Sequence, residues 1–283
     1  MGGERTSHGS QAETTPAAGR EVVSGTVNLR NGRTYHFVTA GPQDAPPLVY
    51  LHGYSDSWRS AELLIPHLSD RFRIHALDQR GHGRTGGGFA DYAIDSFTAD
   101  AAEFVAAVVG RPVTLVRHSL GSLVGQRLAA RHSEMIERLV LIASADTSGG
   151  NEPLAAFGAT LAEFEESLPY DFVYEFQAST LANPIDPTHL EAFVQESMRL
   201  DLDAWRKVAA ALVDDTAVVA MGVHQPTLVL WGDRDSLFDA EAQRKLLALL
   251  PRGELRVYPG VGHGPNWEVP GTVARDIIAF HGG

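Results

Sequence analysis

The sequence of 283 residues predicts an α/β protein with one mostly parallel sheet, helices on both faces of that sheet and an inserted helical segment. Two observations carry this prediction. Short apolar runs typical of buried strands alternate with stretches typical of helices along most of the chain. Residues 148–222 break the alternation, because they hold no convincing strand and are rich in large apolar residues. An open α/β fold of this length can form one core, so we expect a single domain with an insertion.

The expected strands share a pattern in which a short apolar run ends in a turn. The first two, over residues 26–29 and 34–38, form an antiparallel hairpin around the Asn31-Gly32 turn. The strands expected after this hairpin are 48–51, 72–77, 113–116, 139–143, 227–231 and 255–258. The expected helices are 58–68, 96–109, 120–132, 240–250 and 270–281. This repeated order of strand, turn and helix predicts parallel pairing.

Changes in composition along the chain predict its domain organisation. Residues 1–20 hold almost no large apolar side chain, so we expect them to form a disordered tail. Residues 21–147 and 223–283 form the predicted core, and residues 148–222 form the predicted cap. Apolar residues in the cap recur at a spacing that places them on one helix face; they are Leu154, Phe157, Leu161, Phe164 and Leu168.

Composition and charge exclude several classes of function. The chain has no cysteine, which excludes disulfides, thiolate metal sites and a cysteine nucleophile. Its 23 basic and 35 acidic side chains give a formal charge of -12, which would repel nucleic acid and anionic lipid. We find no apolar run long enough to span a bilayer and no secretory pattern, so we expect a cytoplasmic protein that binds neither nucleic acid nor membranes.

The most informative stretch of the sequence is residues 113–122, VTLVRHSLGS, in which an apolar strand runs into a turn of small residues and then a helix. This is the setting of a nucleophile elbow, where a serine at the tip of the turn is strained and its hydroxyl is exposed. Gly121 leaves room for the helix to begin close by. We identify Ser119 as the candidate nucleophile; the alternative is that it only caps the helix.

From about Val22 to its C-terminus, the chain resembles the α/β-hydrolase superfamily. Five motifs carry the resemblance, each at the end of a predicted strand and in the family's order. They are Leu51-His52-Gly53-Tyr54, Asp78-Gln79-Arg80-Gly81-His82-Gly83, the elbow, Trp231-Gly232-Asp233-Arg234-Asp235 and Gly262-His263-Gly264. The resemblance implies the α/β-hydrolase fold with a helical cap, and a serine enzyme similar to esterases and lactonases.

A serine needs a base that takes its proton and a carboxylate that orients the base. The resemblance implies His263 as this base and Asp235 as the acid of a Ser-His-Asp triad. Asp233 and Asp146 are the alternatives for the acid.

Backbone amides are expected to bind the oxyanion that develops during acyl transfer. The resemblance assigns these amides to Tyr54, directly after His52-Gly53, and to Leu120, directly after Ser119. His52 and His118 stand where the family pattern has structural residues, so neither is the preferred base.

Arg117 departs from the family's usual elbow, G-x-S-x-G, because it replaces the first glycine. Three interpretations are open: a neutral change with the side chain threaded to solvent, a charge that tunes the site, and a change that impairs catalysis. The serine at position 119 separates the chain from haloalkane dehalogenases and epoxide hydrolases, which carry an aspartate at the elbow. We therefore expect an acyl-enzyme and not an alkyl-enzyme ester.

We expect a hydrolase of carboxylic esters or lactones of small to medium apolar molecules, as a monomer or homodimer. Carbon-carbon bond hydrolase, amidase and cofactor-free perhydrolase of the haloperoxidase-like kind are alternatives, and a non-catalytic small-molecule receptor is another. We expect no cofactor and no metal, because the sequence has neither H-E-x-x-H nor a phosphate loop. The candidate pocket residues are Trp58, His118, Tyr170, Tyr174 and Trp205.

Overall fold

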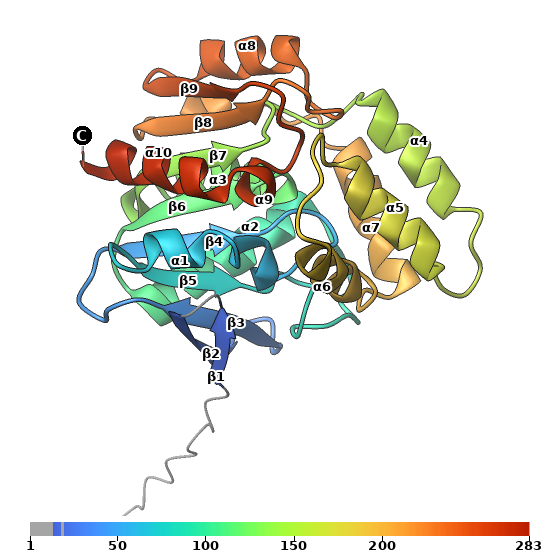
Figure 1. Cartoon of the computed structure of the whole chain (residues 1–283), viewed down its shortest axis with the longest axis horizontal. Coiled ribbons are helices and arrows are strands. Elements are labelled where there is room, and N and C mark those ends of the chain that lie inside the picture. Colours follow the sequence, from blue (N-terminus) through green and yellow to red (C-terminus); the bar gives the residue numbers. More distant parts are fainter. Residues whose placement is uncertain (1–13, 18–19, 283) are drawn as a thin grey trace, which may run out of the picture.

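A computed structural model describes residues 14–17 and 20–282 of the chain. The described strands form one nine-stranded sheet in the order β1-β2-β3-β5-β4-β6-β7-β8-β9 (Figure 1). The strands β1, β2, β3 and β5 pair antiparallel in turn, whereas all pairs from β5 through β4 and β6 to β9 are parallel. This arrangement confirms the predicted α/β fold with a mostly parallel sheet.

The elements follow the predicted alternation of strands and helices. The strands are β1 (Thr14–Ala17), β2 (Arg20–Asn28), β3 (Thr34–Ala40), β4 (Pro47–Leu51), β5 (Arg73–Leu77), β6 (Val113–His118), β7 (Ile136–Ile142), β8 (Thr227–Gly232) and β9 (Gly253–Tyr258). The helices outside the inserted segment are α1 (Ile65–Leu68), α2 (Ile94–Phe104), α3 (Leu120–Arg131), α8 (Ala240–Leu249), α9 (Pro265–Glu268) and α10 (Pro270–Gly282). Each predicted strand overlaps one observed strand, so these predictions are confirmed.

Two predicted segments differ from the structure. The helix expected over 58–68 is divided into a 3-10 turn, η1 (Trp58–Ala61), and the short α1, because Pro66 is tolerated only in the first turn of a helix. The predicted tail lies largely outside the described residues, but Thr14–Ala17 pair with β2 as β1. Strand pairing can satisfy the backbone of these four residues without large apolar side chains, and the disorder of the tail stays a prediction.

Apolar cores cover both faces of the sheet. The helices α2, α3 and α8 contribute to one core, and α1 and α10 contribute to the other. Neighbouring residues of β6 point to opposite faces, so that Leu115 belongs to the first core and Val116 to the second. Because both faces are covered, the parallel strands are almost continuously apolar in sequence.

The segment between β7 and β8 holds helices and no strand among its described residues. Its elements are α4 (Glu152–Leu161), α5 (Tyr170–Ser179), α6 (Pro187–Ser197), α7 (Leu202–Val213) and the turn η4 (Ala220–Gly222). Side chains of Asn151, Asp186 and Asp201 accept amide hydrogen bonds at the first turns of α4, α6 and α7, which explains where these helices begin. In Figure 1 the four helices lie together beyond one end of the strands. The boundaries of a separate cap stay a prediction.

Polar contacts hold the inserted segment near both of its ends, and the one near its C-terminal end is made with α3, the helix that follows Ser119. Near its beginning, the Ser148 hydroxyl donates to the Leu212 carbonyl at 2.7 Å. Near its end, buried Asp215 pairs with buried Arg127 of α3. No helix of the described residues has the length and apolar character needed to cross a bilayer.

Buried histidines make the stability of the fold depend on pH. Burial lowers the pKa of His82 to about 3 and that of His75 to about 4, and burial also lowers the pKa of His52. An unfolded histidine titrates near pH 6.5, so the unfolded chain binds more protons than the folded chain between about pH 3 and 6.5. The free energy of unfolding should therefore fall as the pH falls through this window.

The variant His82→Asn tests this linkage, because it removes one such histidine. We expect the slope of unfolding free energy against pH, between pH 4 and 6, to decrease by about 1.4 kcal/mol per pH unit. Urea unfolding at several pH values measures the slope, with His67→Asn at an exposed position as the matched control. An unchanged slope in His82→Asn would contradict the assignment of a neutral buried His82.

Candidate active site

Ser119 lies on the turn between β6 and α3 in a backbone conformation that L-residues rarely adopt. Its φ is 50° and its ψ is -117°. The Ser119 amide donates to the Ile142 carbonyl at 3.0 Å, and the Ser122 hydroxyl donates to the same carbonyl at 3.1 Å. A Cβ at Gly121 would lie only 2.5 Å from the Leu51 carbonyl oxygen, so α3 begins this close to β4 because residue 121 is glycine.

The structure brings Ser119, His263 and Asp235 into contact. The His263 Nε2 atom lies 2.9 Å from Ser119 Oγ, and Nδ1 lies 2.9 Å from each carboxylate oxygen of Asp235. Asp235 is held in place because its Oδ1 accepts from the amides of Leu237 and Phe238 at 2.8 and 3.1 Å. Since an ionised carboxylate only accepts, Nδ1 carries the proton and the Nε2 lone pair faces the serine hydroxyl.

The alternative acids occupy other positions. Asp233 accepts from the Gly260 amide at 2.6 Å and so supports the turn after β9. Within the described residues, neither Asp233 nor Asp146 hydrogen-bonds to His263. Asp235 is thus the carboxylate with the geometry to orient the histidine.

The predicted oxyanion amides, those of Tyr54 and Leu120, have no hydrogen-bond partner among the described residues. Leu120 is the first residue of α3, and the first amides of a helix have no partner within the helix. The loop that carries Tyr54 passes close to the serine, since a Cβ at Gly53 would lie 3.3 Å from Ser119 Cβ. The Tyr54 hydroxyl donates to the Trp205 carbonyl at 2.6 Å, which ties this loop to α7.

A cavity of about 330 Å³ opens beside Ser119 and His263. Its wall is largely apolar and includes Leu123, Leu154, Phe157, Phe176, Leu212, Leu237, Phe238 and Trp267. These residues come from α3 and α9, from α4, α5 and α7 of the inserted segment, and from the loop after β8. A small polar region of the wall contains Asp56, His118 and Gln177.

Four of the five candidate pocket residues do not line this cavity, and His118 does. Trp58 is buried in the core on the other side of the sheet. Tyr170 and Tyr174 are 38% and 40% exposed, because their spacing of four places both on the outer face of α5. Trp205 is 1% exposed and packs between the helices. The size and aromatic character of a residue therefore did not predict which residues line the cavity, because packing decides which face of a helix turns inward.

Sequence reasoning missed Asp56 and Gln177 as wall residues. Asp56 stands two residues after Tyr54, so its proximity to the predicted oxyanion loop was the available signal. No signal in the sequence pointed to Gln177, because its contact with Asp56 joins segments 121 residues apart. No group of three or more potential metal ligands is found in the part of the chain that the structure describes.

Arg117 is completely buried, so the interpretation that its side chain is threaded to solvent is wrong. The side chain runs along α3, where a Cβ at Gly125 would lie 2.7 Å from Arg117 Cγ. None of its guanidinium nitrogens has a hydrogen-bond partner among the described residues. Burial lowers the pKa of Arg117 well below its usual value.

A serine on a strained strand-to-helix turn, in contact with a histidine and a buried carboxylate, defines an α/β enzyme of the hydrolase class. Residues 46–270 match the family model described as the alpha/beta hydrolase fold. The chain belongs to this family.

Individual relatives are distant in sequence. Epoxide hydrolase 1 of Caenorhabditis elegans is 24% identical over 277 residues, which cover 87% of this chain and 67% of that protein. A pimeloyl-[acyl-carrier protein] methyl ester esterase of Nitrosomonas europaea is 28% identical over 247 residues, 83% of this chain and 94% of the esterase. A solved hydrolase from Pseudomonas aeruginosa superimposes with a TM-score of 0.82 at 22% identity, covering 92% of this chain and 98% of that one.

Replacing the unpaired charge of Arg117 by an apolar side chain of similar length should stabilise the fold. We expect Arg117→Met to raise the free energy of unfolding by about 1–3 kcal/mol, because a buried charge without a partner is costly. Urea unfolding measures the change. The matched control is Arg127→Met, which strands Asp215 in the interior and should destabilise by about 3–5 kcal/mol. A loss of stability in Arg117→Met would show that the guanidinium is compensated.

Proposed function

We propose that this protein is a serine hydrolase that cleaves a carboxylic ester or lactone of small to medium, apolar character through an acyl-enzyme. The observation that carries the proposal is the 2.9 Å contact between Ser119 Oγ and His263 Nε2 at the wall of an apolar cavity. Membership of the alpha/beta hydrolase family supports the reaction class. The esterase of Nitrosomonas europaea, similar to this chain, acts on a methyl ester.

In the acylation step, Ser119 Oγ forms a bond to the ester carbonyl carbon while its proton passes to His263 Nε2. Asp235 stabilises the imidazolium through Nδ1–H. The carbonyl oxygen, now negative, receives hydrogen bonds from the Tyr54 and Leu120 amides, which are fixed before the substrate arrives. When the tetrahedral intermediate collapses, the bond to the alcohol oxygen breaks, and His263 gives its proton to that oxygen.

Deacylation repeats these roles with water. His263 Nε2 takes a proton from a water molecule whose oxygen attacks the acyl carbon, and the same amides hold the second oxyanion. The proton then returns to Ser119 Oγ as the acid is released. A lactone follows the same course, with the alcohol remaining part of the product.

Cavity size and polarity support the proposed substrate class. A volume of about 330 Å³ lies at the lower end of the range for small-molecule sites, which favours small to medium substrates. The wall is mostly apolar and contains no arginine or lysine among its described residues, which disfavours anionic acyl groups. We propose that residues 148–222 act as the cap that shapes this cavity.

The nucleophile is tested with Ser119→Ala. We expect kcat/KM on an activated ester to fall by about 10⁴- to 10⁶-fold, because the attacking oxygen is removed. A serine-directed phosphonate should label the wild type and Ser133→Ala, a serine variant at a remote turn, but not Ser119→Ala. Labelling of Ser119→Ala would contradict the proposal. A panel of esters, lactones and amides, with and without peroxide, ranks the possible reactions.

The cavity wall is tested with Phe157→Ala. Removing this ring should deepen the cavity, so the ratio of rates on long to short acyl esters should rise by about tenfold. Tyr174→Ala, on the exposed face of α5, is the matched control and should leave the ratio unchanged. An equal loss on every ester, with a lower melting temperature, would show that Phe157 only packs the interior.

A further inference from the structure

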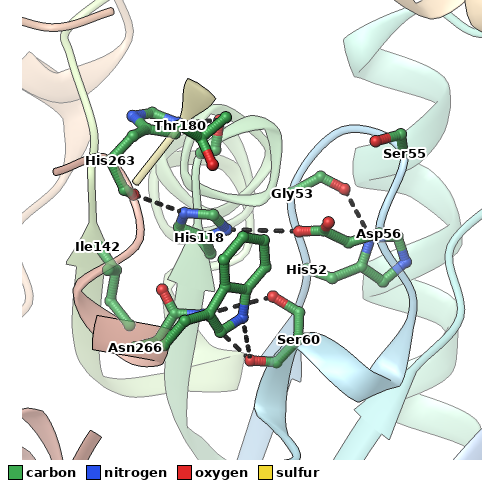
Figure 2. Close-up of polar contacts among 12 residues, drawn as sticks. His52, Gly53, Ser55, Asp56, Ser60, His118, Ile142, Thr180, His263 and Asn266 are labelled. Carbon is green, nitrogen blue, oxygen red and sulfur yellow. Dashed lines mark hydrogen bonds and ion pairs between the residues drawn. The ribbon is translucent and has the colours of Figure 1, made fainter. Parts of the chain in front are cut away.

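A second carboxylate and imidazole lie beside the candidate catalytic residues. His118 is the last residue of β6, directly before Ser119, and its ring lies between Asp56 on one side and the backbone of His263 on the other (Figure 2). The His118 Nε2 atom is 2.9 Å from the His263 carbonyl oxygen. On the opposite side of the ring, Nδ1 is 3.6 Å from Asp56 Oδ2. Both side chains are at least 95% buried.

The contact of Nε2 fixes one proton of the His118 ring, and the approach of Nδ1 to Asp56 bears on the other. A carbonyl oxygen only accepts hydrogen bonds, so Nε2 must carry a proton to bind His263. If Nδ1 were unprotonated, its lone pair would face the Asp56 carboxylate in a buried site, which is electrostatically unfavourable. A proton on Nδ1 would remove this conflict and would give Asp56 an opposite charge at 3.6 Å.

Asp56 has the environment of an ionised carboxylate. Its Oδ1 accepts from Gln177 Nε2 at 3.2 Å. Burial alone would raise the pKa of Asp56, but the neighbouring His118 ring outweighs it and, with Gln177, holds this pKa below its usual value. A Cβ at Gly53 would lie 2.9 Å from His118 Nδ1 and 3.0 Å from Asp56 Oδ2, so the pair lies directly against the oxyanion loop.

The other titratable groups near the pair have partners or are neutral. Burial lowers the pKa of His52 and of His82, so neither supplies a positive charge near pH 7. Asp78 pairs with His36 at 2.7 Å, and its carboxylate also accepts from backbone amides. The ring of His263 is turned toward Asp235. His118 is therefore the group placed to neutralise Asp56.

We propose that Asp56 and His118 form a positioning pair for the base, in which His118 carries protons on both ring nitrogens, donates Nε2–H to the His263 carbonyl and is held by Asp56 through Nδ1–H. Both backbone groups of His263 then have a hydrogen-bond partner: its carbonyl accepts from His118, and its amide donates to the Thr180 carbonyl at 2.8 Å. The pair links the loop that carries Tyr54 and Asp56 to the loop that carries His263. The kinetic consequence rests on the proposed function, but the protonation state does not.

The protonation state is read directly by nitrogen-15 spectra of histidine rings in the full chain at neutral pH. His118 is assigned as the signal that is lost in His118→Gln. In the wild type, we expect both of its ring nitrogens in the protonated range. In Asp56→Asn, which keeps the shape and loses the charge, only Nε2 should remain protonated, with Nδ1 accepting from the asparagine amide. Asp276→Asn, a remote carboxylate bound to Tyr258, is the matched control and should leave His118 unchanged.

Kinetics on an activated ester test the positioning role. Asp56→Ala should lower kcat by about 10- to 100-fold with KM within about twofold, because the histidine loop loses its fixed place but the apolar wall remains. Asp56→Asn, which can still hold the ring by a hydrogen bond, should stay within about threefold of wild type. Likewise, His118→Gln, whose amide can donate to the His263 carbonyl, should retain more activity than His118→Ala.

Two results would overturn the inference. One is a wild-type His118 with a single protonated ring nitrogen. The other is an Asp56→Ala variant that is folded by circular dichroism and has the kcat of the wild type. Failure of the proposed function is a separate result: the phosphonate would then not label Ser119, while the nitrogen-15 spectra would still report the state of His118.

Discussion

The structure depends on one steric constraint, the close approach of α3 to the end of β4 at the turn that carries Ser119. Only a glycine at position 121 permits this approach, because any Cβ there would overlap the Leu51 carbonyl. At the same turn Ser119 adopts its unusual backbone conformation, and its hydroxyl lies 2.9 Å from His263 Nε2. The Leu120 amide at the start of α3 has no hydrogen-bond partner among the described residues. Strain in the turn is therefore maintained by the packing of the sheet around it.

The inserted helices complete the site as well as covering it. The loop that carries Tyr54 is bound to α7 through Tyr54 and Trp205, and to α5 through Asp56 and Gln177. The loop that carries His263 is bound to the segment after α5, because the His263 amide donates to the Thr180 carbonyl. Both loops are consequently placed by contacts with residues 148–222. A movement of these helices would change the geometry of the reacting groups and not only the access of substrate.

How far the sequence predicts such a site depends on the range of the interactions. Periodicity and turn residues are local, so they predicted the strands and the order of the elements. Family motifs pointed to Ser119, Asp235 and His263, and the structure places these three in contact. The pocket wall was mostly mispredicted, because the inward face of α5 is set by packing against distant segments. Tyr174 and Phe176 are equally aromatic, yet only Phe176 reaches the cavity.

Arg117 is expected to lower the stability of the fold, yet it does not disturb the contact between Ser119 and His263. Its guanidinium is buried without a hydrogen-bond partner among the described residues. Arg127, in the helix α3 that follows, is buried too but pairs with Asp215. The space for its side chain exists because residue 125 is glycine, so α3 accommodates the arginine by shape and not by charge. With Arg117 present, Ser119 still lies 2.9 Å from His263. The energetic cost of the substitution therefore falls on the stability of the fold, and the contact geometry of the elbow is kept.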